Sequence, residues 1–167
     1  MDKRVVFITG ASKGIGAAVA VLAAQRGYAV AINYRDDAQA ATRVQRQIEA
    51  TGGTACVVQG DVADADQVER MFTQAEAALG PLHALINSAG ITGPIGQFAE
   101  ADPAMIEQVF RTNVYGAMHC CRTALRRFRA SGTRGVIVNV SSVAAATGSP
   151  NEYVHYAASK GAIDSFT

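Results

Sequence analysis

A short, wholly apolar run followed at once by a glycine-rich turn is the feature that most constrains the fold. The run is Val5–Ile8, and the turn after it carries Gly10, Gly14 and Gly16. Four consecutive apolar residues are typical of a strand buried on both faces of a parallel sheet. Glycines directly after such a strand let the backbone turn tightly and approach a ligand, and the next helix offers free N–H groups to a pyrophosphate. We therefore predict a phosphate-binding strand–turn–helix unit at the start of the chain.

The rest of the chain repeats this alternation of strand and helix. Helix signals include Asp64 with Gln67 as a capping box, and Asp102–Pro103 as an N-cap with a first-turn proline. The expected strands are residues 5–8, 29–33, 55–59, 82–87 and 135–140. Five helices are expected. The first follows the glycine turn and ends near Arg26, and the others are at about 37–50, between Asp64 and Gly80, at 102 to about 129, and around Tyr156. This order predicts an α/β fold with a Rossmann-like, doubly wound parallel sheet in three α/β/α layers, as one domain over residues 1–167.

The end of the sequence does not match a complete fold of this kind. The last helix has no stop signal after Lys160. In the common strand order 3-2-1-4-5-6 the fifth strand has a further neighbour, so Val136–Val140 would be an uncovered edge that is liable to aggregate. We therefore expect the chain to be the N-terminal portion of a longer protein, with the C-terminal strands of the fold missing.

Composition argues against several classes of function. The formal net charge is +1, which argues against a nucleic-acid surface, and the arginines within residues 122–129 are expected to be the solvated end of a helix. The three cysteines have neither metal nor disulfide spacing, so we expect no metal site and a reducing, cytoplasmic location. No apolar run is long enough to span a membrane, and a strand begins almost at the first residue, so we expect no membrane contact and no signal peptide.

Two residues of the last expected helix could form a proton-transfer pair. Tyr156 and Lys160 are four residues apart, so they would project from the same face of the helix. A free tyrosine, with a pKa near 10, is a poor acid or base at neutral pH. A cation about 4 Å away, at an effective dielectric of about 20, favours the phenolate by roughly 4 kcal/mol. Such a spacing is more often an ordinary surface pair, but lysine is scarce here and occurs elsewhere only as Lys3 and Lys13.

Five motifs in a fixed order resemble the short-chain dehydrogenase/reductase family. They are T-G-x-x-x-G-x-G at residues 9–16, N-S-A-G at residues 87–90 where the family has N-N-A-G, a mid-helix Asn113, Ser142 after the fifth strand, and Y-x-x-x-K at residues 156–160. The glycine turn differs in spacing from the common G-x-G-x-x-G fingerprint. The resemblance covers nearly the full chain and is closest to the 3-oxoacyl-carrier-protein reductase and glucose dehydrogenase branches.

The resemblance implies an oxidoreductase that moves hydride between a nicotinamide cofactor and a small-molecule carbonyl or secondary alcohol. In that family pattern Ser142 holds the substrate oxygen, Tyr156 exchanges its proton, Lys160 assists the tyrosine and grips the nicotinamide ribose, and Asn113 supports a proton relay. The implied cofactor-binding residues are Gly10, Ser12, Lys13, Gly14, Ile15, Gly16, Tyr34, Arg35, Asp61, Val62, Asn87, Ala89, Gly90, Tyr156 and Lys160. A homo-oligomer, either tetramer or dimer, is also implied. The alternatives are a non-catalytic nucleotide-binding protein and an inactive truncated fragment.

Several of these residues also have a plainer interpretation. Periodicity places Asn113 within an apolar helical stripe, which favours a hydrogen-bonded structural brace. Ser141 could take the role of Ser142, because both follow the fifth strand. His155 is expected to be a packing or substrate-pocket residue, and Asp61 either faces the adenine or is a simple turn residue.

The end of the second expected strand sets the expected cofactor preference. NAD-selective sites place a carboxylate there for the ribose 2′-hydroxyl, whereas a 2′-phosphate requires cations. Tyr34 occupies that position and is followed by Arg35, with Lys13 in the glycine turn nearby. We therefore predict NADP as the preferred cofactor. NAD remains possible, since Asp36 and Asp37 follow closely and a shift of two residues would reverse the preference.

Overall fold

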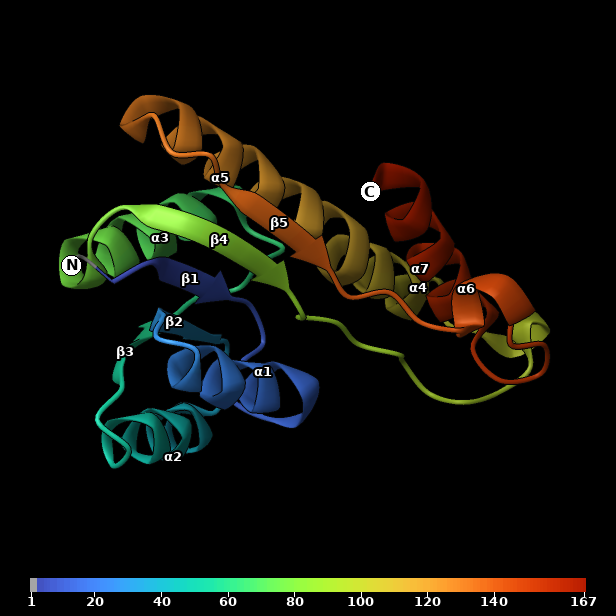
Figure 1. Cartoon of the computed structure of the whole chain (residues 1–167). Coiled ribbons are helices and arrows are strands. Elements are labelled where there is room, and N and C mark those ends of the chain that lie inside the picture. Colours follow the sequence, from blue (N-terminus) through green and yellow to red (C-terminus); the bar gives the residue numbers. More distant parts are fainter. Residues whose placement is uncertain (1–2) are drawn as a thin grey trace.

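In the computed structural model, which describes residues 3–167, five parallel strands lie between layers of helices (Figure 1). The strands are β1 (Val5–Ile8), β2 (Ala29–Tyr34), β3 (Thr54–Gln59), β4 (Leu82–Asn87) and β5 (Val136–Asn139). The helices are α1 (Gly14–Gln25), α2 (Ala38–Glu49), α3 (Ala65–Leu79), α4 (Pro103–Phe110), α5 (Gly116–Ser131), α6 (Ala144–Thr147) and α7 (Val154–Phe166). A 3₁₀ turn, η1 (Phe98–Glu100), and a π-helical turn, η2 (Arg111–Tyr115), complete the described elements.

The sheet has the order β3-β2-β1-β4-β5, with every neighbouring pair parallel. The chain moves outward from β1 to β3 and then crosses back to β4 on the other side of β1. This arrangement confirms the predicted doubly wound sheet. The reversal point lies between the carboxyl ends of β1 and β4, which is where open α/β sheets bind ligands.

Each face of the sheet has its own apolar core. Helices α1 and α2 cover the face that carries Ile8, and helices α3 and α5 cover the face that carries Phe7. The Phe7 ring stacks on Phe72 of α3 with 4.3 Å between ring centroids. All four residues of β1 are buried, as the apolar run predicted, because the strand is central and has helices on both sides.

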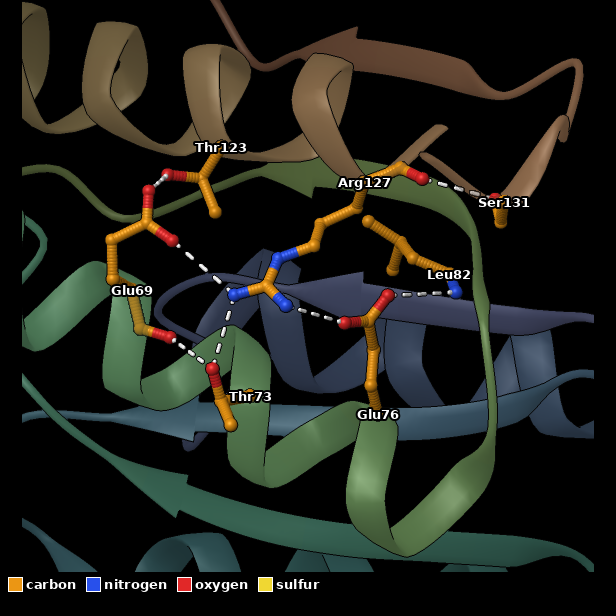
Figure 2. Close-up of polar contacts among 7 residues, drawn as sticks. All are labelled: Glu69, Thr73, Glu76, Leu82, Thr123, Arg127 and Ser131. Atoms are coloured by element: carbon orange, nitrogen blue, oxygen red, sulfur yellow. Dashed lines mark hydrogen bonds and ion pairs between the residues drawn. The ribbon is translucent and has the colours of Figure 1, made fainter. Parts of the chain in front are cut away.

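An ionic network joins α3 to α5 outside this core, and Figure 2 shows the part of it around Arg127. The Arg127 guanidinium donates to Glu69 at 3.2 Å, to Glu76 at 3.0 Å and to the Thr73 hydroxyl at 3.0 Å. The Thr123 hydroxyl donates to the other oxygen of Glu69 at 2.8 Å. The arginines within residues 122–129 were expected to be solvated, but Arg127 is half-buried because two carboxylates of α3 face it. The other arginines of that group are exposed.

The long helix expected over residues 102–129 is interrupted. It consists of α4, the π turn η2 and α5, and Asn113 lies in the middle of the π turn. A π turn inserts an extra residue into a helix and is frequent at functional sites. Two further short elements, η1 and α6, lie in stretches where no helix was predicted.

Strand β5 pairs with β4 along one side only among the described residues. Its Val136 and Val138 side chains are 59% and 48% exposed. They pair in register with Ala84 and Ile86, which pack against the core under α1 and α2. The edge position expected for this strand is therefore seen within residues 3–167.

Candidate active site

A cleft of about 430 Å³ opens along the carboxyl edge of the sheet. It is lined by the turn after β1, the ends of β2, β3 and β4, and one face of α7. The predicted site residues that line it are Gly10, Ser12, Lys13, Ile15, Gly16, Tyr34, Arg35, Asp61, Val62, Ala89, Gly90, Tyr156 and Lys160. Four other predicted residues do not line it: Gly14, Asn87, Asn113 and Ser142.

The turn after β1 lies directly against the end of β4. Gly10 has a φ of +61°, and a Cβ at this position would lie 2.8 Å from the Cα of Ala89. The hydroxyl of Thr9 accepts hydrogen bonds from the amides of Ser88 and Ala89, both at 3.0 Å. A glycine is therefore required at position 10 for two reasons, its left-handed backbone and the close approach of β4.

The start of α1 provides an anion-binding surface. No side chain caps this helix, so its first backbone N–H groups have no side-chain partner. The twelve-residue helix also concentrates partial positive charge at this end. Lys13 at the N-cap and Ile15 in the first turn both line the cleft. These features suit an anion such as a pyrophosphate, and its binding at this turn stays a prediction.

Asn33 at the end of β2 was not singled out from the sequence. It is only 2% exposed, its Oδ1 accepts from the Gly10 amide at 3.1 Å, and its Nδ2 donates to the Gly60 carbonyl at 3.1 Å. The side chain therefore ties the glycine turn to the end of β3. The sequence shows Asn33 only as a polar residue at the end of an apolar strand. Its hydrogen-bond partners could not be predicted, because they are distant in sequence.

The residues after β2 carry charges of both signs. Arg35 donates to Asp36 at 2.7 Å, and this hydrogen bond raises the pKa of the arginine, while burial opposes the shift. Asp37 accepts from the Ala40 amide at 2.9 Å and caps α2. Tyr34 is the last residue of β2, and all four residues of 34–37 line the cleft. Asp36 therefore partly neutralises Arg35, the cation on which the predicted NADP preference rests, and Asp37 caps α2.

Asp61 makes the turn contacts of the plainer interpretation. Its carboxylate accepts from the Ala63 amide at 2.9 Å, and its own amide donates to Gln67 at 3.0 Å. Asp64 caps α3 as predicted, by accepting from the Asp66 and Gln67 amides. In a capping box the Gln67 side chain would accept from the Asp64 amide. Its Oε1 instead accepts from the amide of Asp61, which lines the cleft.

Tyr156 and Lys160 both face the cleft from α7. The Lys160 ammonium lies 5.8 Å from the centre of the Tyr156 ring and donates to the Val140 carbonyl. Lys160 is only 6% exposed, and this burial lowers the pKa of its ammonium, while Asp164 partly opposes the shift. The i,i+4 prediction that the two side chains share one face is therefore confirmed.

Asn113 lies behind the cleft wall and acts as a brace. Its Oδ1 accepts from the Ile91 amide at 2.8 Å, and its Nδ2 donates to the Ile91 carbonyl and to the Ser159 hydroxyl, both at 2.9 Å. Both N–H groups of the amide are thus in use, and only a second lone pair on Oδ1 remains. The brace favoured by periodicity is present, and the proton-relay role stays a prediction.

The two serines after β5 have different positions. Ser141 lines the cleft, and its hydroxyl donates to the Lys160 carbonyl at 3.4 Å. The Ser142 hydroxyl accepts from the Ala144 amide at 3.2 Å at the start of α6. Each hydroxyl is therefore held by backbone, and the assignment of the substrate-binding role to Ser142 stays a prediction.

Three further features of residues 3–167 concern metal binding, membrane spans and the cysteines. No group of three or more His, Cys, Asp or Glu side chains in this range could hold a metal ion. None of the helices described there combines the length and apolarity that crossing a membrane requires. The three cysteines are free; burial raises the pKa of Cys56 to about 11 and raises that of Cys120 as well, which disfavours their thiolates.

Residues 4–167 match the family model described as short chain dehydrogenase. An uncharacterized oxidoreductase, YgfF of Escherichia coli (strain K12), is 47% identical over 165 residues, which cover 98% of this chain and 67% of the relative. The 3-oxoacyl-[acyl-carrier-protein] reductase FabG of Staphylococcus aureus is 34% identical over 161 residues, which cover 96% of this chain and 64% of FabG. A crystal structure of a putative short-chain dehydrogenase/reductase from Burkholderia xenovorans superposes with a TM-score of 0.92 at 33% identity, covering 100% of this chain and 70% of that one. The chain thus spans about two thirds of the length of the proteins it matches.

Proposed function

The chain belongs to the short-chain dehydrogenase family, and on this premise we propose that it is an oxidoreductase that transfers hydride between NADP(H) and a carbonyl or secondary alcohol. One observation carries the proposal: Tyr156 and Lys160 face the same cleft as the uncapped start of α1. A protein that only binds a nucleotide would need the glycine turn but not a phenol and an ammonium in the same cleft. The non-catalytic alternative is therefore not favoured.

In the proposed reaction, different residues of this chain would bind the cofactor and exchange the proton. The amides at the start of α1 would hold the pyrophosphate, and Asp61 and Val62 would face the adenine. When bound, the cofactor supplies or accepts the hydride. Tyr156 would donate a proton to the substrate oxygen during reduction, or remove it during oxidation.

Lys160 would place a positive charge beside the phenol. Its buried position strengthens that effect, because charges interact more strongly where water is excluded. Its ammonium has further N–H groups besides the one donated to Val140, so it can also grip a ribose hydroxyl. Ser142 would bind the substrate oxygen, and the free lone pair of Asn113 would support the proton relay.

We further propose NADP over NAD, a cytoplasmic location, and a homo-oligomer. Arg35 and Lys13 support the cofactor preference, because a 2′-phosphate gains charge-assisted hydrogen bonds from them. A panel of neutral ketones and sugars would identify the substrate, with ethyl acetoacetate as the first ketone because 3-oxoacyl compounds are reduced by the FabG relative.

The catalytic assignment is tested by Tyr156→Phe in the full-length protein, with Tyr153→Phe at the N-cap of the same helix as the matched control. Tyr156→Phe should bind NADPH normally and lose turnover by roughly 100- to 10,000-fold, the usual contribution of general acid–base catalysis. Tyr153→Phe should retain turnover. Equal turnover in Tyr156→Phe and the wild type would refute the assignment.

The cofactor preference is tested by Arg35→Ala, with the exposed Arg46 of α2 changed to alanine as the control. Loss of one charge-assisted contact should weaken NADPH binding about tenfold and leave NADH binding unchanged. Isothermal titration with each cofactor measures both values. Tighter binding of NADH than NADPH by the wild type would overturn the preference.

A further inference from the structure

His155 is a buried titratable side chain that the proposed reaction does not use. It immediately precedes Tyr156 on α7, but it is only 6% exposed and does not line the cleft. Its Nε2 lies 3.0 Å from the Thr92 carbonyl oxygen. Since a carbonyl only accepts hydrogen bonds, the contact requires the hydrogen on Nε2. The ring therefore donates to the segment that follows β4.

That segment, residues 91–97, forms neither helix nor strand, and it is fastened at three points. Asn113 holds both backbone groups of Ile91, His155 holds the carbonyl of Thr92, and the Gly96 amide donates to the Glu152 carbonyl at 2.8 Å. Two of the three fastenings come from residues 152–155, directly before the proposed catalytic tyrosine.

The backbone of the segment also packs on the imidazole ring. Gly93 has a φ of +74°, and a Cβ at this position would lie 2.9 Å from Nε2 of His155 and 3.1 Å from Cγ of Met105. The segment thus passes between the ring and α4. Its first residues, Ile91 and Thr92, line the cleft together with Tyr156, so the ring is the support of a cleft wall.

We propose that His155 is a positioning residue that fixes the part of the cleft wall formed by Ile91 and Thr92 relative to the Tyr156 hydroxyl, and so sets how the substrate carbonyl is presented. The inference rests on the proposed function for its catalytic consequence, but its structural content is independent of it. Histidine suits the position because a planar ring fits under Gly93 while one edge still reaches the Thr92 carbonyl. Phenylalanine would keep the ring and lose the donor, whereas glutamine would keep a donor and lose the ring.

The test uses the full-length protein with H155F and H155Q, and with H119F as a control on a histidine of α5 outside this contact. Hydrogen–deuterium exchange of peptides covering residues 91–97 is measured first, without substrate or cofactor. The hydrogen-bonded amides of Ile91 and Gly96 should exchange about tenfold faster in H155F than in the wild type or H119F, and H155Q should restore much of the protection. If H155F does not fold, H155L replaces it as the variant without a donor.

Kinetics with NADPH and ethyl acetoacetate, or with whichever panel ketone the wild type reduces fastest, form the second readout. H155F should raise KM for the ketone about tenfold and lower kcat less, with the Kd for NADPH unchanged. Unchanged exchange in H155F, absence of rescue by H155Q, or a weakened NADPH affinity would each overturn the proposal. If the wild type fails to bind NADPH, the proposed function fails, while the exchange measurement still decides whether His155 holds the wall.

Discussion

Replacing Asn113 by alanine should cost about 3 kcal/mol of unfolding free energy. The side chain is 2% exposed and makes three hydrogen bonds, two to the backbone of Ile91 and one to the hydroxyl of Ser159. A net contribution of about 1 kcal/mol per bond gives this sum. Ser159 is fully buried, so the loss of a partner at its hydroxyl adds to the cost rather than being offset by water.

Urea unfolding of the full-length protein at neutral pH measures the loss, with an unchanged m-value required for the comparison. Gln108→Ala is the control, because it removes an exposed amide from the preceding helix and should change stability by less than about 0.5 kcal/mol. The brace also predicts faster amide exchange at Ile91. A loss in Asn113→Ala no larger than that in the control would refute this reasoning. If turnover nevertheless vanished, the side chain would serve the chemistry directly.

Three further predictions concern the serines, the buried lysine and the ionic network. Ser142→Ala should lower turnover at least tenfold while Ser141→Ala retains it, because the resemblance assigns the substrate contact to Ser142; the reverse result in steady-state kinetics would transfer the role to Ser141. Burial lowers the pKa of Lys160 below its ordinary value. Between the folded-state pKa and about 10.5, the unfolded chain therefore binds more protons at this lysine than the folded chain does. The contribution of Lys160 to the free energy of unfolding rises with pH over that window. Lys160→Met should reduce that rise in urea unfolding between pH 7 and pH 10, and an unchanged slope would contradict the lowered pKa of Lys160. Arg127→Met should destabilise the protein by about 2 kcal/mol at low salt, because hydrogen bonds between charged groups are lost. The loss should be smaller in 1 M NaCl, because salt screens these charges in the wild type. A loss of stability in thermal unfolding that does not depend on salt would contradict an ionic contribution.

The sequence predicted the sheet well because its signals are local. Val5–Ile8 has the pattern typical of a strand buried on both faces, and the Asp64 and Asp102 caps marked the starts of α3 and α4. The spacing of Tyr156 and Lys160 predicted a shared face, since helix geometry alone determines it. These features depend on neighbours within a few positions, so no knowledge of tertiary packing was needed.

The parts that were missed depend on partners far away in sequence. Nothing local distinguishes the π turn at Arg111–Tyr115 from the α-helix around it, because the same residues suit both. Asn33 gave no sign that its amide would reach Gly10 and Gly60. The position of Ser142 at the start of α6 was equally hidden, since that short helix was not predicted from the sequence.

The contact between the glycine turn and the end of β4 has a consequence for the order of folding. Thr9 bonds to the amides of Ser88 and Ala89, which are 79 and 80 positions away. Local pairing of β1 with β2 closes a much shorter loop, so it is expected to precede the docking of β4. A nascent chain therefore completes this contact, and with it this part of the cleft, only after Gly90 has left the ribosome and β4 has inserted beside β1. A nucleotide bound at this turn would therefore stabilise a sheet in which β1 and β4 are already joined.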